Sequence, residues 1–251
     1  MWLFRKIWGI YWYIVFSLVF FCFVPILFIT MYNPRWHQVG NWVRVQWARL
    51  TFGLTLMPWK VDISPKYKEL RDDPSRKTGI IFTPNHTSFA DIPLFGLAIR
   101  GNFKFFAKKE LEKIPILGKL IANLDILVDR SNPRQSVLAL RKAGDALDGR
   151  VNMCIFPEGT TNNKGSNLMS FKAGPFKLAI EKQLPIVPVT FLDNFRLFLN
   201  DGRHLAQPGV ARVVIHDPID TAGMSVDDIT ELSRKVHTII QNELDKHYAN
   251  R

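Results

Sequence analysis

A long run without charged side chains near the N-terminus constrains the fold of this chain more than any other feature. No Asp, Glu, Lys or Arg occurs between Ile7 and Met31. As an α-helix this run would be roughly 37 Å long at 1.5 Å per residue, enough to cross a hydrocarbon core of about 30 Å. A cleaved signal peptide has a shorter apolar core and a small-residue cleavage site, whereas this run ends in Thr30, Met31 and Tyr32. We therefore expect a retained membrane anchor, a transmembrane helix by length.

A second apolar stretch follows the anchor and permits two interpretations. Its apolar positions recur at helical spacing, at Trp36, Val39, Val43, Trp47, Leu50 and Leu54. Such a face suits a helix that lies in the membrane interface, and it equally suits a helix that packs on a globular domain. Pro25 can bend the first helix, so that it either spans the bilayer or stays in one leaflet. The sequence predicts membrane-associating helices over residues 1–58 and a globular domain over residues 59–251.

The charge balance favours anionic partners. The chain carries 33 Lys and Arg against 22 Asp and Glu, a formal net charge of +11. Nucleic acid, anionic lipid, a phosphorylated substrate and an acidic carrier protein all fit this charge. The apolar N-terminus favours membrane lipid among them, and we expect no nucleic-acid partner. Cys22 and Cys154 support neither a disulfide framework nor a metal cluster, so a reducing compartment is expected.

Short apolar runs alternate with helical patterns through the globular part. The expected strands are residues 79–82, 103–107, 125–128, 151–156, 186–191 and 211–216. The expected helices are residues 88–99, 116–123, 133–147 and 175–183, with a long C-terminal helix over 225–248 that Ser225 and Asp228 begin in a capping-box pattern. This alternation predicts an α/β fold with a mostly parallel central sheet flanked by helices.

A histidine and an aspartate stand where such a fold places chemistry. His86 follows the strand at 79–82, at a strand-to-helix turn that commonly faces a substrate crevice. Asp91 would lie about one turn into the next helix, from where it can reach back to the imidazole and fix its tautomer. His86 can then act as a general base on a substrate hydroxyl without a Ser or Cys nucleophile. Taken alone, the pair fits an ordinary helix cap equally well.

A second segment, with the sequence FPEGT, follows the strand at 151–156. By itself it is a strand that ends in a Pro-Gly turn, which is common. Gly159 lets the backbone approach a ligand closely, and Glu158 can accept a hydrogen bond from a substrate hydroxyl.

The two segments together resemble the glycerophospholipid acyltransferases, in particular the 1-acylglycerol-3-phosphate (lysophosphatidic acid) acyltransferase type. The sequences LVDR at 127–130 and LPIVPV at 184–189 resemble two further blocks of that family, in the same order. The resemblance covers residues 79–192. It implies that His86 is the catalytic base and Asp91 its orienting partner. It also implies a substrate-binding set, which is Arg130 for phosphate, Glu158, Gly159 and Thr160 for the glycerol-phosphate, and Lys172 as a further cation.

The resemblance also implies a reaction and a place in the cell. A fatty acyl group would pass from acyl carrier protein or coenzyme A to the sn-2 hydroxyl of 1-acyl-glycerol-3-phosphate, which gives phosphatidic acid. No cofactor and no metal ion is expected, since the acyl thioester is itself a substrate. The family's N-terminal helices can form a membrane-associating hairpin. We expect the cell inner membrane, with the catalytic domain facing the cytoplasm.

Two alternatives stay open. The family usually has Arg after the FPEGT segment, whereas this chain has Thr161, which leaves room for another acceptor such as a lyso-amino-lipid. A catalytically silent membrane-binding protein would also explain the cations and the apolar helices. A row of cations attracts anionic headgroups or a carrier protein, or is merely solvated, and its members are Arg100, Lys104, Lys108, Lys109 and Lys113.

Overall fold

A seven-stranded sheet forms the centre of the protein, which we describe from a computed structural model for residues 2–129, 131–199 and 205–249. The strand order is β1-β9-β6-β2-β5-β3-β4. Neighbours run parallel except β6 and β9, which are antiparallel. The strands are β1 (Trp59–Ile63), β2 (Ile81–Pro84), β3 (Phe103–Lys108), β4 (Ile126–Val128), β5 (Asn152–Cys154), β6 (Ile186–Phe191) and β9 (Ala211–Ile215). A separate hairpin pairs β7 (Phe198–Leu199) with β8 (Leu205–Ala206).

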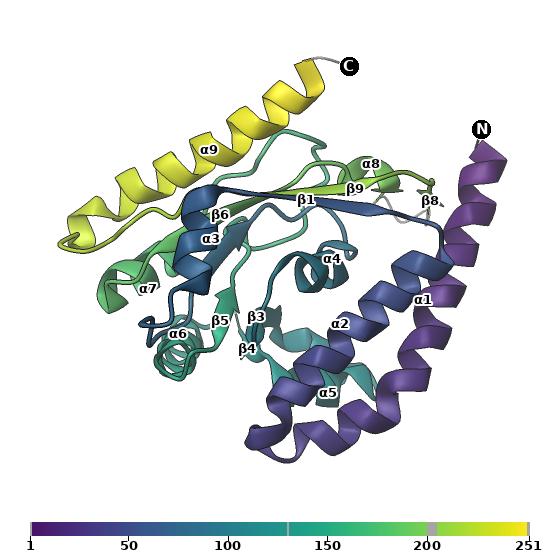
Figure 1. Ribbon diagram of the computed structural model, residues 1–251, viewed down its shortest axis with the longest axis horizontal. Helices are drawn as coiled ribbons and strands as arrows, with labels where there is room; N and C mark the ends of the chain where they lie inside the picture. The colour runs from purple at the N-terminus through teal and green to yellow at the C-terminus, as the bar shows by residue number, and fades with distance from the viewer. Residues whose placement is uncertain (1, 130, 200–204, 250–251) are drawn as a thin grey trace.

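Helices cover both faces of the sheet (Figure 1). One group is α1 (Trp2–Met31), α2 (His37–Leu54), α3 (Pro65–Asp72) and α4 (Asp91–Ala98), and the other is α6 (Pro133–Asp148), α7 (Gly174–Lys182) and α9 (Ile229–Ala249). The shorter elements are η1 (Pro34–Trp36), η2 (Lys109–Lys113), α5 (Leu117–Leu124), α8 (Asn194–Leu197) and η3 (Val226–Asp228). Successive strand side chains point to opposite faces, so Ile81 packs with the second group and Phe82 with the first. The predicted α/β fold with a mostly parallel sheet is confirmed.

The N-terminal helices are built into this core. Trp12 of α1 is fully buried in the same apolar cluster as Phe82 and Phe95. Val43 and Phe52 of α2 are also fully buried, so this helix packs on the globular domain. Trp42, Leu50 and Leu54 of α2 remain exposed, as do Leu3, Ile7, Ile14 and Leu18 of α1. By length and composition α1 could cross a membrane, and it continues as a helix through Pro25.

The structure differs from the sequence prediction in several elements, and the short β7, β8 and α8 are among those not expected. Strand β1 was not expected, because it is an edge strand with mostly exposed side chains and no apolar run. Helix α3 was not expected either. Helix α4 begins only at Asp91, not at residue 88. The backbone N–H groups of Thr87 and Ser88 donate to the Asp91 carboxylate and hold a turn there. Asp91 therefore stands at the first position of the helix, not one turn into it.

A partly buried histidine next to the sheet makes stability depend on pH. Burial lowers the pKa of His216 to about 4, more than Asp217 raises it, and its Nε2 lies 2.7 Å from Thr190 Oγ1. The unfolded chain takes up this proton below about pH 6.5, whereas the folded chain does so only below about pH 4. The stabilisation is therefore present above pH 6.5 and is lost as the pH falls through this window.

From this group alone we expect the free energy of unfolding to fall by about 2 kcal/mol between pH 7 and pH 5. Replacing His216 by glutamine, which keeps a polar partner for Thr190, should reduce the pH-dependent fall by that amount. Denaturant unfolding of both proteins at the two pH values measures it. Equal falls in wild type and H216Q would contradict the assignment.

Candidate active site

The turn after β2 is fixed to the end of β6 by a buried amide. Asn85 is fully buried, its Nδ2 donates to the Phe191 carbonyl at 3.1 Å, and its Oδ1 accepts from the Phe191 N–H at 2.7 Å. These two hydrogen bonds resemble those between paired strands, with the Asn85 side-chain amide in place of one backbone. It makes the turn rigid at the residue before His86, which agrees with a structural role for Asn85.

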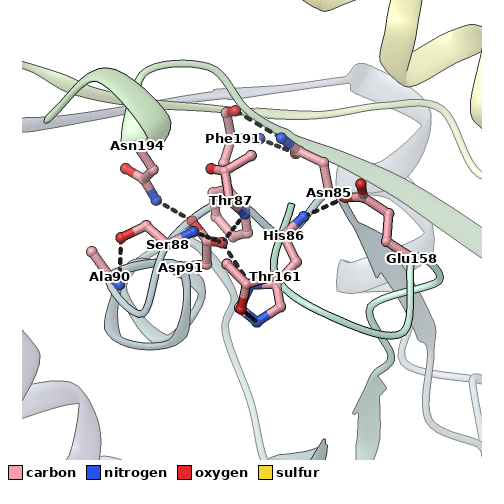
Figure 2. A network of polar contacts seen from close by, with 10 residues as sticks. All are labelled: Asn85, His86, Thr87, Ser88, Ala90, Asp91, Glu158, Thr161, Phe191 and Asn194. Carbon is pink, nitrogen blue, oxygen red and sulfur yellow. Dashed lines mark hydrogen bonds and ion pairs between the residues drawn. The ribbon is translucent and has the colours of Figure 1, made fainter. Parts of the chain in front are cut away.

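His86 and Asp91 are in direct contact across this turn (Figure 2). His86 Nδ1 lies 2.8 Å from Asp91 Oδ2. A carboxylate oxygen accepts, so the imidazole carries its proton on Nδ1 and presents a lone pair on Nε2. The Asp91 side chain is fully buried, and that of His86 is 18% exposed. A buried carboxylate thus fixes an imidazole ring that stays partly exposed, which is a geometry suited to general-base chemistry.

The other ring nitrogen of His86 faces a hydroxyl. Thr161 Oγ1 lies 3.3 Å from Nε2. The imidazole ring stacks on Phe156 with centroids 4.1 Å apart and planes inclined by 26°. The ring is thus held by Asp91 at one nitrogen and by Phe156 on one face, while the other nitrogen already meets an oxygen of the kind it would deprotonate.

The Glu158 carboxylate bonds to the backbone of the turn that carries His86. It is 1% exposed, its Oε1 accepts from the His86 N–H at 2.8 Å, and its Oε2 accepts from the Met169 N–H at 3.0 Å. Burial raises the pKa of Glu158, an effect that these N–H groups oppose. The His86 carbonyl accepts from the Asn162 N–H at 2.7 Å. Glu158 was expected to meet a substrate hydroxyl, but the structure gives both of its oxygens backbone partners.

Gly159 and Lys172 meet at a cavity that Phe156, the ring on which His86 stacks, also lines. Gly159 has φ +74°, and a Cβ there would lie 3.3 Å from Lys172 Cγ, so the lysine stem crosses over the glycine. A cavity of about 440 Å³ is lined by both residues and by Phe156, with apolar walls from Phe106, Val128 and Leu140. Thr160 is exposed. The structure thus brings Gly159 and Lys172 together with the ring on which His86 stacks, whereas Arg130 lies outside the described residues.

The row of cations is not uniformly free. Lys104 Nζ donates to the Leu124 carbonyl at 2.7 Å, and burial lowers the pKa of this lysine. Lys108 Nζ lies 3.5 Å from Glu110 Oε1, and Lys109 Nζ lies 3.5 Å from Asp129 Oδ2.

Over the described ranges, the structure has no group of three or more His, Cys, Asp or Glu that could hold a metal ion.

Two contacts of the pair could not be read from the sequence. Asn194 Nδ2 donates to Asp91 Oδ1 at 2.6 Å, and Asn194 is fully buried. Asn194 comes after β6 and is separated from Asp91 by 103 positions along the chain. Only the pairing of β2 with β6 brings the two residues close. The stack of His86 on Phe156 likewise depends on the pairing of β2 with β5.

Comparison with known proteins points to one family. The sequence model of the acyltransferase family matches residues 66–192. A chloroplast 1-acyl-sn-glycerol-3-phosphate acyltransferase of Arabidopsis thaliana is 28% identical over 194 residues, 76% of this chain and 52% of that protein. A putative enzyme of the same name from Caenorhabditis elegans is 32% identical over 152 residues, 59% of this chain and 53% of that protein. The chain spans about half the length of these curated relatives.

A solved structure has the same fold. The crystal structure of the 1-acyl-sn-glycerophosphate acyltransferase PlsC from Thermotoga maritima superposes with a TM-score of 0.75 at 22% identity. The match covers 96% of this chain and 97% of that one. It therefore includes the two N-terminal helices as well as the sheet.

Proposed function

The chain belongs to the acyltransferase family, and from this premise we propose that it acylates the sn-2 hydroxyl of 1-acyl-glycerol-3-phosphate to give phosphatidic acid. The observation that carries the proposal is the oriented base. His86 Nδ1 bonds to buried Asp91, and Nε2 faces a hydroxyl oxygen at 3.3 Å. A silent membrane-binding protein has no use for a base held in this way. The names of the relatives support the choice of acceptor.

In the proposed reaction His86 acts twice. Its Nε2 takes the proton of the acceptor hydroxyl while that oxygen attacks the carbonyl carbon of the acyl thioester. Asp91 stabilises the imidazolium that forms. When the C–S bond breaks, the imidazolium returns the proton to the leaving sulfur, which gives the ester and a free thiol. Holding both substrates at this turn supplies the rest of the rate through proximity.

One described cation at the cavity beside Phe156 supports a phosphate-bearing acceptor. Lys172 crosses Gly159 at the edge of the cavity beside Phe156. We propose that Lys172 and Arg130 bind the phosphate, with Gly159 and Thr160 against the glycerol, because a guanidinium fork and an ammonium suit phosphate oxygens. Glu158 fits a different role, in which it ties the FPEGT segment to the backbone of His86.

The remaining parts of the proposal concern the donor and the membrane. The donor is an acyl thioester of acyl carrier protein or coenzyme A, and no cofactor takes part. The exposed apolar side chains of α1 and α2 would hold the enzyme on the inner membrane with the catalytic domain in the cytoplasm. Phe89, two residues before Asp91, contacts Trp12 of α1 at a centroid distance of 5.1 Å. The helix that would meet lipid thus packs directly against the catalytic turn.

One observation favours a second acceptor class. Thr161 stands where the family usually has Arg, so this position offers no positive charge to a phosphate. Competition between 1-acyl-glycerol-3-phosphate and a phosphate-free lyso-amino-lipid, with a limiting acyl thioester and purified enzyme, separates the two. The proposal expects phosphatidic acid as the main product, and preference for the phosphate-free acceptor would overturn it.

Thr161 itself should matter little to the rate. In the proposed complex the acceptor hydroxyl replaces the Thr161 hydroxyl at His86 Nε2. The bond between Thr161 and His86 is therefore absent from the transition state. We expect Thr161→Val to keep kcat/KM within about threefold of wild type, the range of a neutral substitution. Thr161→Ser, which keeps the hydroxyl, is the matched control. A loss in T161V as large as that of a variant without His86 would instead make the hydroxyl a participant.

A further inference from the structure

The Asp91 carboxylate receives donors from two different parts of the chain. Oδ2 accepts from its own turn, at 2.8 Å from His86 Nδ1, 2.7 Å from the Thr87 N–H and 2.9 Å from the Ser88 N–H. Oδ1 accepts from Asn194 Nδ2 at 2.6 Å. Asn194 thus supplies the long-range bond that fixes the rotation of the carboxylate (Figure 2).

The bond to Asp91 determines which way the Asn194 amide is oriented, with its nitrogen toward the carboxylate. Among the described residues, Asn194 Oδ1 has no hydrogen-bond partner, although the side chain is fully buried. A flipped amide would place that oxygen against the carboxylate, so only the observed orientation is stable. A buried carbonyl without a partner lowers stability, and the residue is therefore badly explained by packing alone. Its contact with Asp91 explains it.

We propose that Asn194 is a positioning residue of the reaction, which holds the Asp91 carboxylate in the plane that orients the His86 ring. This inference rests on the function proposed above for the His86–Asp91 pair. Asn194 lies on α8, just beyond residues 66–192 that match the acyltransferase family. The residue reaches the pair because β6 lies beside β2 and ends next to the catalytic turn.

Loss of the amide donor should have two consequences. The carboxylate loses the restraint on Oδ1 and keeps the three donors on Oδ2, so its plane is less tightly fixed and His86 spends less time in the reactive orientation. Its negative charge is also less compensated, so the pair binds the inactivating proton more tightly at low pH. The other titratable or charged groups on the described elements around the pair include Glu158, Cys154 on β5, Arg196 on α8, and Asp193 with its partners Arg212 and His247. They are unchanged in the variants used below.

The test compares Asn194→Ala and Asn194→Ser with wild type and with Asn152→Ala. Asn152 is a matched buried amide, 4% exposed, whose Oδ1 accepts from the Ile80 N–H away from the site. Steady-state rates of the full-length enzyme in detergent micelles are measured across pH. For N194A we expect kcat to fall about tenfold to hundredfold, the loss typical when a residue that orients a metal-binding side chain is removed. KM should stay within about twofold, and the acid limb should move to higher pH. N194S, with a shorter donor, should lie between, and N152A should keep the wild-type pH profile.

A second readout does not require turnover. The proton on His86 Nδ1 gives a downfield ¹H NMR signal that is assigned by its absence from H86A. It should broaden or disappear in N194A and persist in N152A, because water exchanges faster with a proton whose acceptor is less tightly fixed. A wild-type signal and an unmoved acid limb in folded N194A and N194S would overturn the proposal. If wild type makes no phosphatidic acid, the acceptor assignment fails, and the NMR signal still decides the role of Asn194.

Discussion

Replacing His86 by alanine should reduce kcat/KM for phosphatidic acid formation by about 10³-fold, within the 10²–10⁴ that general-base catalysis contributes. The loss follows from the geometry, since His86 Nε2 is the nitrogen presented to the incoming hydroxyl while Nδ1 is tied to Asp91. Only the proton transfer is removed, so KM for the acceptor should change little. Initial rates with purified enzyme in micelles measure the effect.

Two comparisons make this result specific. His237, which packs on Phe171 at a centroid distance of 4.8 Å, serves as the control histidine. H237A should keep the wild-type rate within about threefold, and H86A should show the wild-type thermal transition. A folded H86A enzyme with normal turnover would remove the base from the mechanism.

Replacing Trp12 by alanine should destabilise the protein by about 3–5 kcal/mol, as for other large aromatic side chains removed from a core. Trp12 is fully buried. Its ring centroid lies 4.8 Å from that of Phe198, 4.9 Å from that of Phe16 and 5.1 Å from that of Phe89. The substitution leaves a cavity under the turn that carries His86 and Asp91. We expect the midpoint of thermal unfolding to fall by roughly 6–20 °C, using the scaling for chains of this size.

Leu18 provides the matched control on the same helix. It is 62% exposed, so L18A removes apolar surface from α1 without opening a cavity in the protein. Its unfolding midpoint in detergent should stay close to that of wild type. If W12A and L18A were equally stable, α1 would be an appendage and not a part of the core.

The fold could be predicted where side-chain pattern and burial agree. The buried strands β2, β3, β5 and β6 follow apolar runs, and the capping box of Ser225 and Asp228 correctly marked the start of the last helical segment. Strand β1 was missed because it lies at the edge of the sheet and has no such run. The start of α4 was misplaced because backbone N–H groups of Thr87 and Ser88 bond to the Asp91 carboxylate, and these bonds shape the turn before the helix.

The candidate site shows the same division. The contact of His86 with Asp91 depends on residues close in sequence, and spacing alone suggested it. The partners of Glu158 and the approach of Asn194 depend on which strands become neighbours. No local pattern contains that information, so a glutamate expected to meet substrate bonds to the backbone of the catalytic turn. The built-in position of Trp12 was also hidden, because an apolar anchor and a core helix have similar sequences.

The proposed acyl transfer is tested by mass spectrometry of the products that purified enzyme makes from 1-acyl-glycerol-3-phosphate and an acyl thioester. We expect phosphatidic acid and free thiol in equal amounts, since each transfer breaks one C–S bond and forms one ester bond. Release of thiol without phosphatidic acid, or no reaction with this acceptor while a phosphate-free lyso-lipid is acylated, would contradict it.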